Sequence, residues 1–187
     1  MAFSLEVPQK RSAEPKRNRI TIMQKRWLLS AHLLCITAWL GASFCTLAFS
    51  ITALFTTDPH LLNAVSVFID ILDHTIIRIG AGGTLLTGVL LAALTQWGLL
   101  RFYWITVKEI VSILCITVDL LAIRWNEQLI SLSASQGLHA LSNPVYLTNR
   151  TLLFVGILFH IFALLGVIVI SIFKPWGQRK SVNQRRA

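Results

Sequence analysis

The chain has 187 residues, 55% of them hydrophobic and only 13% charged, against roughly 25% charged residues in soluble domains. Its net charge of +9 invites a nucleic-acid partner, but the basic residues gather at the two ends of the chain, before and after the apolar stretches. We therefore exclude a soluble domain and a nucleic-acid partner, and we predict a single-domain integral membrane protein.

Residues 1–26 are predicted to form a basic cytoplasmic tail, because they carry prolines and basic side chains without any apolar periodicity. Met23 is an alternative start to Met1. The first predicted membrane span covers residues 27–55. It exceeds the roughly 20 apolar residues that a helix needs to cross a bilayer, and we expect it to remain as an uncleaved anchor.

Asp58 followed by Pro59 predicts a helix start, with the aspartate as N-cap and the proline at the first helical position. A helix continuing from there into the second span, residues 76–100, is too long for a hydrocarbon core of roughly 30 Å. We therefore expect residues 59–73 to form an amphipathic segment outside the core, on or beyond the outer surface.

The remaining spans are predicted at residues 102–123 and 152–173, separated by an outer loop at 126–149 that glycine, asparagine and proline punctuate. A second basic tail, residues 175–187, follows the last span. Basic residues flanking spans mark the cytoplasmic side, so both tails are expected there. The predicted fold class is all-α: a membrane-spanning four-helix bundle with N-in/C-in topology, occupying residues 27–174.

Small residues recur every fourth position in the first two spans, which keeps them on one helix face and lets a neighbouring backbone approach closely. The two sets are Ala38, Ala42, Thr46 and Ser50, and Gly80, Thr84, Gly88 and Ala92. We predict that these faces pack against each other within the chain, and a dimer interface is the alternative.

The third span carries a polar stripe, with Lys108, Ser112, Cys115 and Asp119 on one face. Charged groups inside a membrane are costly and usually face partners in the bundle interior, so we expect Asp119 to pair with Arg78. Glu109 is expected to approach His32 of the first span. These groups act either as interfacial anchors and internal glue or as a polar site along an ion path.

Haem b is the cofactor that histidines in a four-helix membrane bundle suggest, and the candidate ligands are His32 and His160. Their expected heights differ, at roughly 8 and 21 Å above the inner surface, so they do not form a ligand pair across one iron. We predict no cofactor. The three cysteines lie inside spans without metal-ligand spacing, and no catalytic constellation is found, so no metal site or catalytic residue is predicted.

Several motifs stand in order along the chain: H-x6-W-x-G at residues 32–41, T-G at 87–88, W-G at 97–98, W-x-x-x-K at 104–108 and K-P-W-G at 174–177. This series resembles a family of bacterial four-helix integral membrane proteins of unknown function, with a first helix similar to that of copper-resistance D-type proteins. The resemblance implies the fold and a location in the bacterial cytoplasmic membrane, and it implies no activity.

The leading functional hypothesis is a non-enzymatic accessory or interaction protein of the inner membrane, whose partners are the lipid bilayer and a second copy or another membrane protein. One alternative is a component of a small oligomeric transporter or channel. The other is a membrane haem or quinone redox protein.

Overall fold

The computed structural model describes residues 20–95 and 102–174, and this part of the chain is all-helical. Its elements are α1 (Ile22–Phe55), α2 (Pro59–Leu72), the π-helix η1 (Asp73–Ile77), α3 (Arg78–Leu94), α4 (Tyr103–Gln136), the 3-10 helix η2 (Gly137–Ser142) and α5 (Pro144–Phe173). Most of the predicted N-terminal tail, the predicted C-terminal tail and the last residues of the predicted span 76–100 lie outside the described residues.

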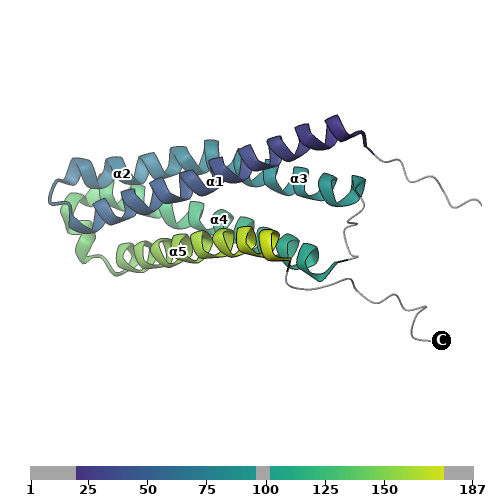
Figure 1. Ribbon diagram of the computed structural model, residues 1–187. Coiled ribbons are helices and arrows are strands. Elements are labelled where there is room, and N and C mark those ends of the chain that lie inside the picture. Colours follow the sequence, from purple (N-terminus) through teal and green to yellow (C-terminus); the bar gives the residue numbers. More distant parts are fainter. Residues whose placement is uncertain (1–19, 96–101, 175–187) are drawn as a thin grey trace, which may run out of the picture.

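The helices form four rods that lie side by side, because α2, η1 and α3 follow one another without a break (Figure 1). The start of α1 and the end of α5 lie at the same end of the molecule, which we call the tail end. The other end, which we call the capped end, carries the α1–α2 turn and η2, and η2 contacts α2, α4 and α5.

Local sequence sets where the rods begin and end. Asp58 caps α2 as predicted, since its Oδ1 accepts a hydrogen bond from the backbone N–H of His60 at 2.9 Å. Asn143 caps α5 in the same way, again just before a proline. Helix α4 ends at Gly137, whose positive φ of 54° is readily reached only by glycine.

The distribution of side chains is that of a protein in lipid. Helix α1, the continuous rod Pro59–Leu94 and α5 are each long and apolar enough to cross a membrane. Large apolar side chains such as Ile79, Leu86 and Phe162 point outward, while serine, threonine, asparagine, aspartate and histidine side chains are buried between the helices. This inside-out pattern supports the prediction of a membrane protein.

The predicted contact between the first two spans is confirmed. A methyl group placed on Gly80 of α3 would lie 3.0 Å from both Cβ and the backbone nitrogen of Trp39, and 3.1 Å from the carbonyl oxygen of Cys35. The absence of a side chain at Gly80 therefore lets α3 lie directly against the backbone of α1.

The predicted outer loop at 126–149 is wrong, because α4 continues through its first half and α5 starts before its end. Some of the polar residues there are buried against neighbouring helices. Asn126 is fully buried and its Nδ2 donates to the carbonyl of Ser66 at 2.9 Å, and Ser133 donates to Asn63 at 3.0 Å. Hydrogen bonds between helices account for these buried polar residues. Their presence in the sequence was therefore not a sign of a loop.

In the predicted amphipathic segment 59–73, Leu62, Val65 and Ile69 are buried on one face, and the exposed face also carries large apolar side chains such as Phe68 and Ile71. The segment does not lie flat on a surface. Helix α2 packs lengthwise against α1 and α4, and the irregularity in its rod is η1, which comes before the glycine run at 80–83. A π-turn adds a residue to the turn and shifts the helix face that follows it.

Candidate functional site

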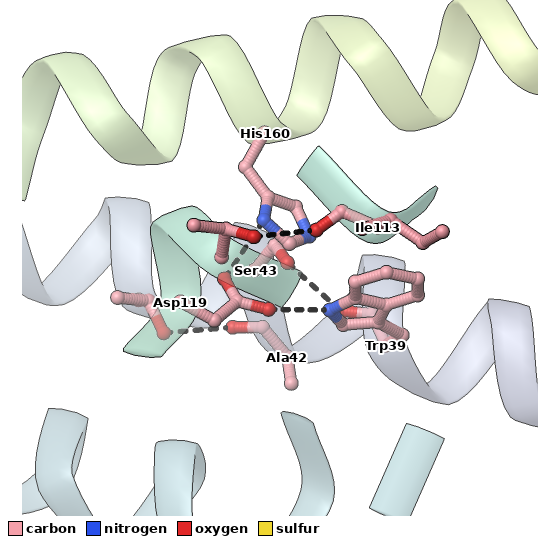
Figure 2. A network of polar contacts seen from close by, with 8 residues as sticks. Trp39, Ala42, Ser43, Ile113, Asp119 and His160 are labelled. Carbon is pink, nitrogen blue, oxygen red and sulfur yellow. Dashed lines mark hydrogen bonds and ion pairs between the residues drawn. The ribbon is translucent and has the colours of Figure 1, made fainter. Parts of the chain in front are cut away.

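Three side chains from three helices meet near the middle of the bundle (Figure 2). The indole Nε1–H of Trp39 in α1 donates to Asp119 Oδ2 in α4 at 3.3 Å. The other carboxylate oxygen, Oδ1, lies 2.9 Å from Nδ1 of His160 in α5. The Trp39 and His160 rings contact edge to face, with centroids 5.0 Å apart. Asp119 is thus shared by a neutral donor and an imidazole.

The position of each side chain follows from helix periodicity. Trp39, Ser43 and Thr46 share one face of α1, and all three are buried. His160 lies 14 residues before the end of the described chain at Lys174, so it stands roughly 21 Å along α5 from the tail end. His160 is therefore near the middle of α5, which runs from Pro144 to Phe173.

Asp73 brings a second carboxylate to the same place. It is the first residue of η1 and only 7% exposed, whereas the side chain of Asp70, one turn earlier, is 34% exposed. A cavity of about 20 Å³ lies beside it, large enough for a water molecule. The polar groups that line this cavity are Ser43, Thr46, Asp73, Asp119 and His160. These five residues and Trp39 are called the central site below.

Several polar atoms of the central site have no protein hydrogen-bond partner among the described residues. These are Asp73 Oδ2 and both ring nitrogens of His160, whose Nδ1 is close to Asp119 without being aligned for a hydrogen bond. Buried polar groups are normally satisfied by protein or water. Unused acceptors beside a water-sized cavity mark a place where a proton or a water molecule can bind.

A second polar group lies nearer the tail end and is called the tail-end cluster: His32, Thr87, Lys108 and Glu109. His32 Nδ1 lies 2.8 Å from the hydroxyl of Thr87. The Lys108 ammonium stands 5.4 Å from the centroid of the Trp104 ring, a cation–π distance. His32 and Glu109 both lie beside Gly88 of α3. Among the described residues, the two side chains do not form an ion pair with each other.

The structure corrects one predicted pair. Arg78 is exposed on the outside of α3, and Asp119 pairs with His160 and Trp39 instead. The polar stripe of the third span is present, since Ser112 and Cys115 are buried on the face that carries Asp119. Sequence reasoning missed Asp73. The cluster of Asp, His and Thr at residues 73–75, inside an apolar run, was the available signal.

The two candidate haem ligands are not brought together. His160 contacts Trp39, whereas His32 lies seven residues before Trp39 on α1, roughly 10 Å along the helix axis, and its partner is Thr87. Each imidazole therefore belongs to a different polar group, His160 to the central site and His32 to the tail-end cluster.

Comparison with protein-family models, with curated proteins and with solved structures gave no match. The resemblance to bacterial four-helix membrane proteins stays a prediction. We therefore infer the function from the geometry of the central site and the tail-end cluster.

Proposed function

We propose that the protein crosses the bacterial inner membrane four times, with its tail end on the cytoplasmic side. Helix α4 is the rod with the most charge, yet its exposed side chains from Ile110 to Leu121 are mostly apolar, while Lys108, Glu109 and Asp119 are at least half-buried. Such a helix suits lipid on one side and a polar interior on the other. Lys25 and Arg26 at the tail end support the orientation.

We further propose that the protein binds and releases a proton at the central site, as part of proton transfer across the membrane. The observation that carries this proposal is the Asp119–His160 pair at 2.9 Å beside a water-sized cavity that Asp73 also lines. Ionisable side chains buried in a membrane bundle typically form proton relays, and histidine titrates near neutral pH.

The chemistry needs only a proton. A proton entering the cavity adds to the His160 imidazole, whose positive charge the Asp119 carboxylate then balances, and it leaves again when the imidazole releases it. No bond other than N–H or O–H forms or breaks, and no electron moves. This function falls within the transporter alternative. The accessory role and the redox alternative stay predictions, with no contact in the central site to support them.

The proposal is tested by measuring proton flux into liposomes that contain the purified protein, a trapped pH-sensitive dye and an imposed membrane potential. Asp119→Asn is expected to lower the flux at least about tenfold, because it removes the charge that balances the imidazolium. Asp70→Asn is the matched control, since Asp70 also lies 3.3 Å from a histidine, His74, but both side chains are more exposed than those of Asp119 and His160. It should keep the wild-type flux.

Two results would contradict the proposed function. One is a wild-type flux no greater than that of empty liposomes. The other is an Asp119→Asn flux equal to that of the wild type, which would leave the pair as internal glue between α4 and α5.

A further inference from the structure

We propose that His32 and Glu109 form a second proton-binding site, which delivers protons from the tail end to the central site. This inference rests on the proposed function, because it gives the central site a route to one side of the membrane. The ligand is a proton carried by water. The contacts of each side chain and the polar atoms between the two sites support this proposal, and the packing at the capped end differs from that at the tail end.

The hydrogen bonds of Thr87 define the state of His32. The Thr87 hydroxyl donates to the carbonyl of Gly83, one turn back on α3. When the single hydroxyl hydrogen is used in that bond, Thr87 Oγ1 accepts from His32 Nδ1 at 2.8 Å and the imidazole donates. The proton of neutral His32 is then on Nδ1, and Nε2 is the basic atom that accepts another proton.

Glu109 stands next to that imidazole. A methyl group on Gly88 would lie 3.5 Å from His32 Cε1 and 3.6 Å from Glu109 Oε1, so both side chains rest over the same bare stretch of α3 backbone. Across the described helices they do not touch as an ion pair. Because both side chains lie against the same stretch of backbone, a water molecule between them can carry a proton from one to the other.

The other charged groups around this site can be named helix by helix. Helix α4 adds Lys108, whose ammonium lies over Trp104. Helix α1 adds Lys25 and Arg26, about two turns before His32. Helix α3 has no charged side chain after Arg78, and α5 has no titratable side chain between His160 and Lys174. Glu109 is therefore the acid that faces His32.

Polar atoms lie between the two sites. Glu109 precedes Asp119 by ten residues, roughly 15 Å along α4, and Ser112 and Cys115 are buried on the intervening face. On α3, Thr84 lies between Gly80, which contacts Trp39, and Thr87. The Oγ1 atom of Thr84 is buried and has no hydrogen-bond partner among the described residues. Hydroxyls at these positions offer steps for a water-borne proton.

Among the described residues, the capped end is packed differently. Its core is formed by closely packed apolar side chains, among them Leu62, Val65 and Leu129. Buried polar groups there bond between helices, as Asn126 does with Ser66 and Ser133 with Asn63. Fewer apolar side chains are buried at the tail end. The buried apolar cluster there consists of Ala92, Trp104 and Ile105. Since water enters polar and roomy places and avoids packed apolar ones, the central site exchanges protons toward the tail end.

The test uses the liposome flux assay on Glu109→Gln and His32→Asn. Each is expected to lower proton flux at least about tenfold, because each removes a group that passes on the proton. Glu127→Gln is the matched control: the same change on the same helix, at an exposed position toward the capped end. It should leave the flux unchanged. Adding imidazole, a small diffusible proton carrier, should restore flux to Glu109→Gln and not to Asp119→Asn.

The outcomes separate the two proposals. Wild-type flux in both tail-end variants, together with a flux lost in Asp119→Asn, would overturn this inference and leave the proposed function standing. Wild-type liposomes without flux would overturn the proposed function itself. Rescue by imidazole distinguishes a proton-carrying role of Glu109 from a structural one, because a misfolded bundle is not repaired by a buffer.

Discussion

Asp119→Ala is expected to destabilise the folded protein by about 2–3 kcal/mol, because it leaves the Trp39 indole N–H and the His160 ring without their shared partner. His160→Ala removes the contact from the other side and leaves a carboxylate facing a cavity. Each substitution is expected to destabilise the protein more than breaking a surface pair would, because water cannot freely replace the missing partner inside the bundle. The measurement is thermal unfolding in detergent micelles, followed by helicity.

The double variant decides whether Asp119 and His160 act as a unit. Because each single change strands the other partner, the two together should cost less than their sum, with a coupling of about 1 kcal/mol or more. Asp70→Ala and His74→Ala provide the comparison cycle on a less buried pair, where a smaller coupling is expected. Additive effects in both cycles would show that the 2.9 Å contact contributes nothing to stability.

Gly80→Ala is expected to be the most damaging single-methyl addition in α3, at about 1–3 kcal/mol. The new methyl would lie 3.0 Å from Trp39 Cβ and backbone nitrogen, and backbone atoms of α1 cannot move aside as a flexible side chain can. The two helices must separate. Trp39 would then shift away from Asp119, so proton flux should fall together with the unfolding temperature.

Gly82→Ala is the control, two residues further along the same helix. A methyl there would meet nothing within 4 Å, and alanine favours a helix over glycine by up to about 1 kcal/mol. The expected result is unchanged or higher thermal stability. If Gly80→Ala and Gly82→Ala behaved alike, the close approach of α1 and α3 would not exist in the membrane.

The sequence contained enough to predict the apolar helices and part of the central site. The period of small residues predicted the α1–α3 contact that Gly80 makes, and the polar stripe singled out Asp119. The predicted partner of Asp119, Arg78, was wrong, because the prediction used only the expected similar heights of the two residues along their helices. Depth does not say which way a side chain points, and Arg78 points outward.

Asp73 shows a second limit. It is three residues after Asp70, a spacing that places both on one face of a regular α-helix, and yet Asp73 is buried while the side chain of Asp70 is 34% exposed. The π-turn that begins at Asp73 has no sequence signature of its own, and it packs against α1. Polarity misled in the same way near Asn126, where buried side chains bond between helices and the pattern resembles a loop.

The central claim is that the Asp119–His160 pair holds an exchangeable proton inside the membrane, and nitrogen NMR of the histidines in lipid bilayers tests it most directly. The chain has five histidines, and His160→Asn identifies the signal of interest by its loss. We predict that the His160 ring changes protonation state with pH, and that Asp119→Asn moves this transition while Asp70→Asn does not. A His160 ring that keeps one protonation state throughout the pH range of the folded protein would contradict the account.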